Sequence, residues 1–348
     1  MPYSEKWFSR FISRDHHVQG GYMNIVFHGE NACSFSEGFQ NELDAPANIT
    51  LLPDRLESDA DRKAYADADV IIGVKFDTSL PVPARLGLFH VPGAGYDAVD
   101  LEAVPASAVV CNCFGHEQAI AEYVFASILD RHVPLRDADM RLRAGDWSYT
   151  SGAISRAHDE IAGKTIGLLG FGHIGKAIAK RAKAFEMDVI VANRSPVELS
   201  PMVNASFTLD ALVGFWPAAD FIVVSIPSTP ETKRIVGRNA FTMMRSDAVI
   251  MNVGRGATID EDALYEALEN RSIGGAVIDT WYKYPAANQQ GVMPSTKPFH
   301  QLSNIVMTPH MSGWTLGTIR RRKNTIADNI NRTARGESCV NIVRDSVR

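Results

Sequence analysis

The sequence predicts an α/β protein with two Rossmann-like or flavodoxin-like domains, each built on a doubly wound parallel sheet, with a cleft between them. Short apolar segments alternate with polar or helical connections along most of the chain, which favours parallel strands joined by crossovers. Residues 165–185 contain an apolar run, a glycine-rich turn and an amphipathic run, the order strand, turn and helix. The length of 348 residues favours two domains over one.

The glycine-rich turn reads Gly170-Phe-Gly172-His173-Ile174-Gly175. The first glycine allows a tight turn, the second lets the backbone approach a pyrophosphate, and the third lets the helix pack against the strand. Backbone N–H groups at the helix start, around His173 and Ile174, then face the phosphates. A second apolar run at 188–192 closes a unit of about thirty residues. The segment therefore predicts dinucleotide binding.

The end of that second strand indicates which dinucleotide is bound. NAD-binding units usually carry an acidic residue there for the ribose hydroxyls, whereas this chain has Asn193, Arg194 and Ser195. No carboxylate repels a 2′-phosphate, and a guanidinium and a hydroxyl are available to bind it. We therefore expect NADP, with NAD also possible. The alternative is that Arg194 stacks on adenine as a solvated loop residue, which would leave the preference mixed.

The remaining elements follow the same alternation. We expect residues 1–22 to be an N-terminal extension, 23–115 with 316–348 to form the substrate domain, and 116–315 to form the NAD(P)-binding domain. The expected strands are 24–27, 48–52, 69–74, 86–91, 108–111, 165–169, 188–192, 221–226, 247–252, 275–279 and 304–307. Helices are expected over 116–132, from 173 to 185, from 260 onward and over 315–335, where Gly336 is a C′ glycine. Residues 135–159 contain no clear strand.

Composition excludes several classes of partner. The formal net charge of −5 gives no electrostatic reason to bind nucleic acid or an anionic membrane. No apolar run is long enough to span a bilayer, and the first 22 residues lack the apolar core of a secretory signal. The four cysteines are too scattered for a disulfide framework or a metal site. We expect reduced cysteines, no bound metal and a cytoplasmic location.

Three polar clusters, 252–256, 277–285 and 308–313, each begin where an expected strand of the second domain ends. Open α/β sheets bind ligands at the carboxyl ends of their strands, so the clusters are candidates for one site. In this order behind a dinucleotide motif they resemble the D-isomer-specific 2-hydroxyacid dehydrogenase family. The resemblance covers nearly the whole chain. It includes residues 92–97, similar to the family's substrate-carboxylate loop, and 225–232, similar to its cofactor-wall motif.

The resemblance implies a role for particular residues. Arg255 would hold the carboxylate and 2-oxo group of a substrate, and His310 would be the general acid and base. Asp279 would bond the nicotinamide carboxamide. These groups suit hydride transfer to a 2-oxo acid, which needs a fixed cation, a proton donor and a held nicotinamide. The implied loop donors to the substrate carboxylate are Gly93, Ala94 and Gly95. The implied cofactor-binding residues beyond the glycine motif and 193–195 are Ile226, Pro227, Thr232, Val253, Gly254, Asp279 and Gly313.

Tyr284 departs from the family pattern and completes the expected catalytic set with Arg255 and His310. The family normally has a Glu directly before this proline, where its charge stabilises the protonated catalytic histidine. With Tyr284 the imidazolium form of His310 loses that stabilising neighbour. Either another carboxylate substitutes, Glu117 or Asp97, or His310 serves as the acid over a lower pH range.

Two further residues are candidates for the substrate pocket. Lys75 stands at a strand end that borders the pocket in the family, and it could pair with a second anionic group of the substrate. A solvated strand-end lysine is an equally good interpretation. Trp281 could narrow the pocket, although core packing or a dimer contact explains an aromatic residue there equally well.

The resemblance implies a 2-oxoacid reductase similar to glyoxylate/hydroxypyruvate reductases, acting on a small anionic 2-oxo acid. One alternative is a branch that uses another hydride donor, phosphite or formate, because such enzymes also keep an Arg and a His. Another is a dinucleotide-sensing binding protein like the corepressors of this fold. Retention of both Arg255 and His310 argues against a sensor, and Tyr284 argues weakly for one. The strandless segment 135–159 resembles the arm by which family members pair, which implies a homodimer.

Overall fold

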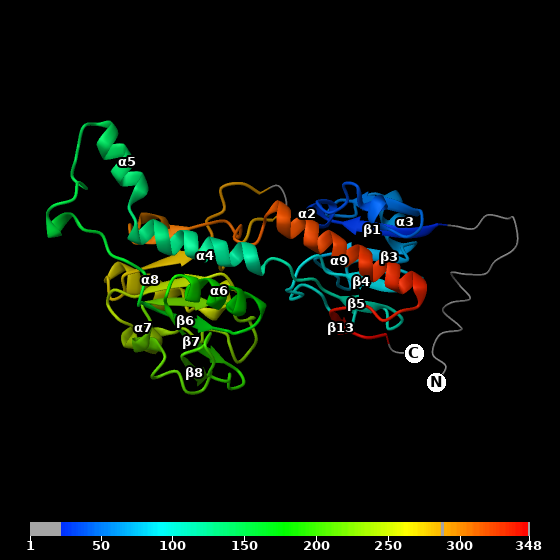
Figure 1. The fold of residues 1–348 in the computed structure, drawn as a ribbon. Helices are drawn as coiled ribbons and strands as arrows, with labels where there is room; N and C mark the ends of the chain where they lie inside the picture. Colours follow the sequence, from blue (N-terminus) through cyan, green and yellow to red (C-terminus); the bar gives the residue numbers. More distant parts are fainter. Residues whose placement is uncertain (1–21, 287–288, 347–348) are drawn as a thin grey trace, which may run out of the picture. The chain divides into compact units, whose positions relative to one another are not determined.

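The computed structural model describes residues 22–286 and 289–346, and these fold as two units (Figure 1). The first unit contains the chain up to Gly115 together with the segment from Leu316 onward, and the second runs from His116 to Thr315. Apart from Tyr22, the expected N-terminal extension lies outside the described residues. Within the described ranges, every helix is too short or too polar to cross a membrane.

The first unit is built on a six-stranded sheet with the order β13-β5-β4-β3-β1-β2. The strands are β1 (Met23–His28), β2 (Ala47–Leu52), β3 (Val70–Gly73), β4 (Leu88–His90), β5 (Val109–Cys111) and β13 (Ile342–Arg344). The five strands from β1 to β5 pair in parallel, as the crossover pattern predicts. The edge strand β13 is not among the strands predicted from the sequence, and it pairs with β5 in the antiparallel direction. Arg344 holds this edge strand by donating to the backbone oxygens of Val104, Pro105 and Ala108.

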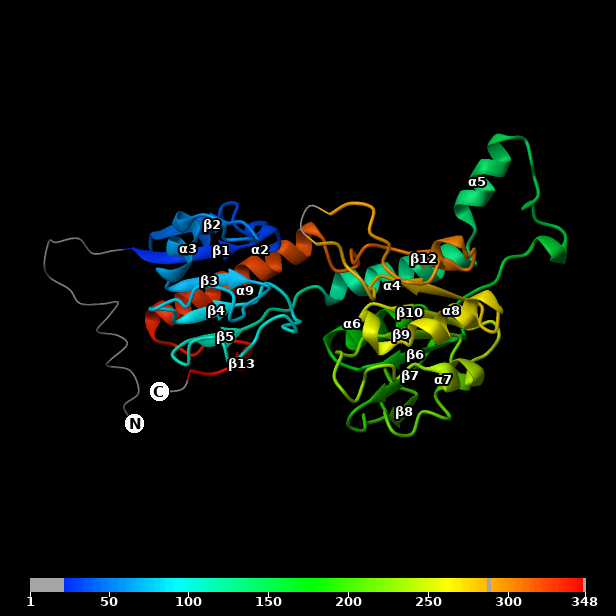
Figure 2. The same ribbon diagram turned by 180° about the vertical axis from the view of Figure 1, so that it is seen from behind.

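Helices cover both faces of this sheet, as Figures 1 and 2 show. They are α2 (Glu30–Cys33), η1 (Phe39–Glu42), α3 (Asp59–Ala66) and α9 (Leu316–Arg335). On one face, Tyr65 of α3 packs in a core with Phe76 and Phe89. On the other, Ile326 and Ile330 of α9 pack against strand residues. The last helix ends as predicted, because Gly336 has a φ of 72°.

The second unit contains a seven-stranded sheet with the order β12-β11-β10-β9-β6-β7-β8. Its strands are β6 (Thr165–Leu169), β7 (Asp188–Asn193), β8 (Ala205–Thr208), β9 (Phe221–Val224), β10 (Val249–Asn252), β11 (Gly275–Ile278) and β12 (Ile305–Met307). All six pairings are parallel. The chain order reverses between β6 and β9, so this is a doubly wound sheet with its switch point beside the glycine-rich turn.

The helices of the second unit also cover both faces of the sheet. They are α4 (Glu117–His132), α5 (Leu135–Arg143), α6 (His173–Ala184), α7 (Arg238–Met243) and α8 (Glu261–Glu269), with short turns η2 (Ile154–Arg156), η3 (Trp216–Ala218), η4 (Gly256–Thr258) and η5 (Phe299–Gln301). Residues of α4 and α6 share one core with the sheet, and residues of α7 and α8 share the other. Asp260 caps α8 by accepting from the Ala263 N–H at 2.9 Å.

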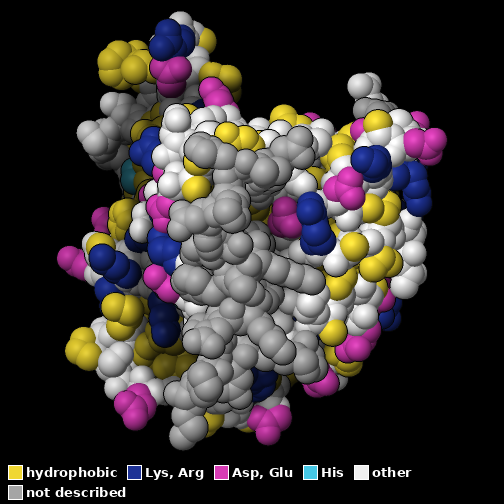
Figure 3. Space-filling view, turned by 90° about the vertical axis from the view of Figure 1, so that its right-hand side faces the viewer, with side chains coloured by type: hydrophobic (Ala, Val, Ile, Leu, Met, Phe, Trp, Pro, Cys, Tyr) yellow, Lys and Arg dark blue, Asp and Glu magenta, His cyan; other side chains and the backbone are white. Residues whose placement is uncertain are grey.

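Residues 135–159 extend away from the sheet of their own unit, as Figures 1 and 2 show. They contain α5 and η2 and, as predicted, no strand. Apolar side chains of this segment are exposed, among them Trp147 at 67% and Ile154 at 95%. Figure 3, where the segment projects at the upper left, shows hydrophobic side chains beside charged ones on its surface. We call residues 135–159 the arm.

Candidate active site

Backbone geometry at the glycine-rich turn allows a close approach of strand and helix and leaves open space beside Gly172. Gly170 has a φ of 106°, a conformation that favours glycine. A β-carbon on Gly175 would lie 2.3 Å from the Gly170 carbonyl oxygen, so only glycine lets α6 start this close to β6. A β-carbon on Gly172 would meet nothing within 4 Å. The open side of Gly172 and the first N–H groups of α6, which begins at His173, together fit a pyrophosphate.

The carboxyl end of β7 presents two exposed polar residues. The Asn193 side chain accepts from the Phe171 N–H at 3.4 Å and donates to the Ser195 carbonyl at 3.3 Å, which ties this strand end to the glycine-rich turn. Arg194 and Ser195 are exposed. In the described ranges no side-chain hydrogen bond or ion pair engages the Arg194 guanidinium, so its donors face solvent.

The segment after β9 forms a compact turn around Thr232. The buried Thr232 hydroxyl donates to the Pro227 carbonyl at 2.7 Å and accepts from the Thr229 N–H at 2.8 Å. This hydroxyl therefore shapes the turn. A β-carbon on Gly254 would lie 2.8 Å from the Ile226 carbonyl oxygen, so the turn packs directly against the segment after β10.

Arg255 stands on a turn that two glycines allow. A β-carbon on Gly256 would lie 2.3 Å from the Trp281 carbonyl oxygen, which brings the end of β10 against the end of β11. Asn252 stabilises the turn by accepting from the Gly254 N–H at 3.1 Å and donating to the Arg255 carbonyl at 3.0 Å. The Arg255 guanidinium donates to the Gly254 carbonyl at 2.9 Å and lies close enough to Tyr284 to oppose the rise that burial causes in the pKa of that phenol.

Tyr284 and His310 form a hydrogen-bonded pair. The tyrosine Oη lies 3.0 Å from His310 Nδ1, and it also accepts from the Trp281 N–H at 3.1 Å. The hydroxyl can donate to Nδ1 of a neutral imidazole or accept from Nδ1–H of the imidazolium form, so the contact is compatible with both protonation states of His310. Nε2 is the ring nitrogen that faces away from Tyr284. The imidazole of His310 is exposed, as a group that exchanges protons with a substrate must be.

Asp279 is fully buried and binds the turn that carries His310. This turn, residues 308–313 between β12 and α9, is called here the hairpin of His310. Its carboxylate accepts from the Met311 N–H at 2.9 Å, the Ser312 N–H at 3.0 Å and the Thr308 hydroxyl at 2.6 Å. Three donors on an ionised carboxylate make strong hydrogen bonds. Asp279 therefore fixes the residues on both sides of His310.

In the first unit, the expected carboxylate loop is shaped by the carbonyls of its own backbone. The Gly93 carbonyl accepts from the Cys113 N–H at 3.1 Å, and the Ala94 carbonyl accepts from the Asn112 side chain at 2.7 Å. Gly95 is exposed. Because the carbonyls point into the fold, the N–H groups of this loop are available to a ligand.

Two cations of the first unit bear on the expected substrate pocket, Lys75 and Arg322. Lys75 is ion-paired with Asp77 at 2.8 Å, and this contact lowers the pKa of Asp77 to about 2. Arg322 of α9, which sequence patterns do not single out, places Nη1 3.9 Å from the position that a β-carbon of Gly93 would take. Trp281 is buried, and its indole N–H donates to the Thr308 carbonyl at 2.8 Å.

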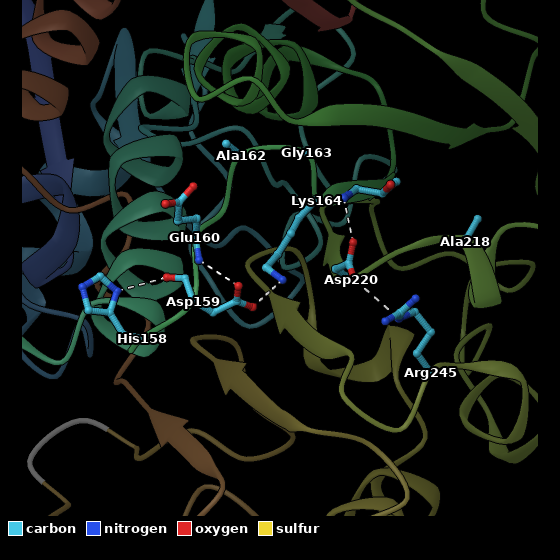
Figure 4. A pocket seen from close by; sticks show the side chains of 10 residues that line it. His158, Asp159, Glu160, Ala162, Gly163, Lys164, Ala218, Asp220 and Arg245 are labelled. Atoms are coloured by element: carbon cyan, nitrogen blue, oxygen red, sulfur yellow. Dashed lines mark hydrogen bonds and ion pairs between the residues drawn. The ribbon is translucent and has the colours of Figure 1, made fainter. Parts of the chain in front are cut away.

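A hollow lies at the opposite edge of the seven-stranded sheet, where the amino ends of its strands are (Figure 4). Residues 158–160 and 162–165 line it together with Ala218, Asp220 and Arg245. Most of its charged side chains are paired with one another, Asp159 with Lys164 at 2.6 Å and Arg245 with Asp220 at 3.4 Å. It lies away from the carboxyl strand ends where doubly wound sheets bind ligands, and we assign it no chemistry.

The fold and the site define a class, an oxidoreductase domain that binds a nicotinamide dinucleotide. The family model for the D-isomer specific 2-hydroxyacid dehydrogenase NAD binding domain matches residues 125–312. The chain is 32% identical over 297 residues to glyoxylate/hydroxypyruvate reductase B of Pectobacterium carotovorum, which covers 81% of this chain and 88% of that protein. The chain belongs to the D-isomer specific 2-hydroxyacid dehydrogenase family.

A second relative is similar in sequence, and two solved structures have the same fold. Identity is 31% over 284 residues to D-3-phosphoglycerate dehydrogenase of Methanocaldococcus jannaschii, covering 80% of this chain and only 52% of that protein. The chain thus spans about half the length of this relative. A D-isomer specific 2-hydroxyacid dehydrogenase family protein from Aeromonas salmonicida has the same fold, with a TM-score of 0.77, 24% identity and coverage of 93% and 99% of the two chains. The structure of an acyclic imino acid reductase in complex with NADPH and D-Arg also has this fold, with a TM-score of 0.73 and 23% identity. The match covers 92% of this chain and 100% of that chain.

Proposed function

We propose that this protein is an NADP-preferring D-2-hydroxyacid dehydrogenase that works as a 2-oxoacid reductase on a small anionic substrate. The observation that carries the proposal is the pairing of Tyr284 with His310 beside Arg255, at the carboxyl strand ends of a dinucleotide-binding sheet. A cation and a proton donor at one place are what reduction of a 2-oxo acid requires.

In this proposal each side chain has one task. Arg255 binds the substrate carboxylate and 2-oxo group through charge-assisted hydrogen bonds. In its imidazolium form, His310 gives a proton from Nε2 to the oxygen that becomes the hydroxyl, and Tyr284 holds the ring by accepting from Nδ1–H. The dinucleotide supplies the hydride when bound. The backbone N–H groups of Ala94 and Gly95 are the proposed donors to the substrate carboxylate.

The preference for NADP rests on Arg194 and Ser195. A 2′-phosphate is a dianion. The exposed guanidinium and the neighbouring hydroxyl at the end of β7 are better partners for this phosphate than for a ribose hydroxyl. The absence of a carboxylate among residues 193–195 removes the repulsion that discriminates against the phosphate.

The experiment that tests the proposal is an assay of NADPH and NADH oxidation with a panel of 2-oxo acids, including glyoxylate and hydroxypyruvate. Phosphite and formate are tested in the reverse direction with NADP⁺ and NAD⁺. We expect turnover with 2-oxo acids and a preference for NADPH. Turnover only with phosphite or formate would assign the alternative donor branch, and tight cofactor binding without any turnover would assign a sensor.

We also propose a homodimer in which two arms pair, in a cytoplasmic protein. The arm exposes large apolar residues, which a monomer seldom leaves in water, and twofold pairing is the commonest closed assembly. Light scattering at micromolar concentration should give twice the mass of the 348-residue chain. Trp147→Ser with Ile154→Ser should shift the mass toward one chain, and a monomer mass for the unaltered protein would overturn the proposal.

A further inference from the structure

A chain of hydrogen bonds runs from helix α4 to the hairpin of His310. The Tyr123 Oη lies 2.7 Å from the Thr308 Oγ1, and the Thr308 hydroxyl donates to Asp279 at 2.6 Å. Because the single proton of the Thr308 hydroxyl points to the carboxylate, the Tyr123 hydroxyl must donate to Thr308. The direction of the chain is therefore fixed from Tyr123 to Asp279.

The conformation of His310 explains why the hairpin needs these bonds. His310 has a φ of 59°, in the left-handed region, which is unfavourable for a residue with a side chain. A left-handed residue lets the next two backbone N–H groups converge on one anion. Here the N–H groups of Met311 and Ser312 converge on Asp279. The carboxylate thus stabilises the conformation that presents the imidazole.

The Tyr123 hydroxyl is suited to hold this carboxylate in place. Tyr123 is half-buried on α4, a helix whose Ile120 and Val124 are packed in the core beneath it. Burial raises the pKa of Tyr123 to about 12, so the hydroxyl remains a donor throughout the working pH range. Its distances to Thr308, and from Thr308 to Asp279, are those of strong O–H···O bonds.

We propose that Tyr123 is a positioning residue for the acid–base chemistry, acting through Thr308 and Asp279 to hold His310 in its left-handed conformation. This inference rests on the proposed function of His310. It assigns to α4, whose sequence reads as plain core packing, a part in the reaction. Tyr123 itself touches neither His310 nor Arg255 in any described contact, so its effect reaches the imidazole only through the hairpin.

The test is Tyr123→Phe, which removes one oxygen and keeps the ring in the core. A misplaced acid–base group can cost up to a hundredfold in rate, so for this indirect contact we expect kcat to fall roughly tenfold. KM for the 2-oxo acid and the dissociation constant of NADPH should stay within about twofold. Tyr265→Phe is the matched control, because the Tyr265 hydroxyl also donates to a carboxylate, that of Glu269 at 3.0 Å on α8. It should leave kcat unchanged.

Thr308 gives a second, independent check. Thr308→Val removes the link between Tyr123 and Asp279, and Thr308→Ser keeps it. The serine variant should restore most of the activity that the valine variant loses. In the double variant Tyr123→Phe with Thr308→Val, the loss should be no larger than for Thr308→Val alone, because both changes break one chain. Additive losses would contradict the chain.

A readout that needs no turnover separates this inference from the proposed function. In protein with ¹⁵N-labelled histidine, the ring signals of His310 are identified by their loss in His310→Ala. Tyr123→Phe should shift or broaden them, and Tyr265→Phe should not. Unchanged His310 signals and unchanged kcat in a folded Tyr123→Phe protein would overturn the positioning role. If the unaltered enzyme reduces no 2-oxo acid, the proposed function fails and the NMR result alone decides the positioning.

Discussion

The hairpin of His310 and the end of strand β7 lie at the same edge of the same sheet, and they are held in opposite ways. At the hairpin, a buried carboxylate binds two backbone N–H groups and a hydroxyl around one left-handed residue. At β7, the guanidinium of Arg194 and the hydroxyl of Ser195 are exposed and, within the described ranges, bonded to nothing.

The difference shows which side chains of this fold must be held in position before a ligand binds. A proton must be transferred over a short and well-aligned path, so the acid–base group is positioned in advance. Recognition of a phosphate relies on charge, and a long flexible cation can form its hydrogen bonds after the phosphate has bound. Changes at the hairpin should therefore affect rate, and changes at β7 should affect cofactor affinity.

The largest effect should come from His310→Ala. Loss of a general acid typically lowers turnover by about 10²–10⁴-fold, while NADPH affinity should hardly change because His310 does not belong to the dinucleotide turn. Steady-state rates with glyoxylate, and NADPH binding by fluorescence, check both halves of this prediction. Near-normal turnover in the variant would remove His310 from the mechanism.

Arg194→Ala should produce the reverse pattern. A hydrogen bond to a charged group contributes about 1.5–3 kcal/mol, so NADPH binding should weaken roughly 10- to 150-fold while NADH binding and kcat at saturation stay nearly constant. Arg156→Ala, at an exposed arginine of the arm, is the control for a general loss of positive charge. Equal losses for both cofactors would show that Arg194 does not bind the 2′-phosphate.

Tyr284→Glu tests whether the residue beside His310 sets the pH range over which the histidine is protonated. A carboxylate beside Nδ1 stabilises the imidazolium form by its negative charge, whereas the Tyr284 hydroxyl that contacts Nδ1 carries no charge. The protonated acid should then persist to higher pH, and the rate of 2-oxoacid reduction should fall off at a higher pH than in the unaltered enzyme. Tyr284→Phe, which has no charge to offer, is the control. Identical pH–rate profiles for Tyr284→Glu and the unaltered enzyme would mean that another carboxylate already serves His310.

The smallest effect concerns stability. His90 in the first unit is fully buried, its Nδ1 lies 3.1 Å from the Val91 carbonyl, and burial lowers its pKa to about 4. The unfolded chain binds this proton near pH 6.5, so folding is favoured above that pH and loses up to about 1.4 kcal/mol per pH unit as the pH falls toward 4. His90→Gln should remove this share of the slope in urea unfolding measured at pH 7.5, 6.5 and 5.5. An unchanged slope would show that His90 does not carry it.

Short-range patterns predicted the parts of the site that lie within one turn of chain. The glycine-rich turn at 170–175 and the alternation of strands could be predicted because they depend on local features of the sequence. These features are the backbone conformations that need glycine and the spacing of apolar side chains. The class of protein followed from the order of three polar clusters along the chain.

The contacts between distant segments could not be predicted in the same way. Tyr123 stands at helical spacing among apolar residues, so nothing local distinguishes its hydroxyl from a core ring, and its partner is Thr308. The ion pair of Lys75 with Asp77 is visible only in the folded chain, and Arg322 approaches Gly93 only through the folded position of α9. The edge strand β13, Ile342–Arg344, has only three residues, which is too short to predict a strand or its antiparallel pairing from the sequence.

The measurement that tests the central claim most directly is the reduction of hydroxypyruvate by NADPH, with the configuration of the product determined by chiral chromatography. The account predicts that each mole of NADPH oxidised yields one mole of the D-2-hydroxy acid, and that this product disappears with His310→Ala. Formation of the L-isomer, or NADPH that binds and is never oxidised by any 2-oxo acid of the panel, would contradict it.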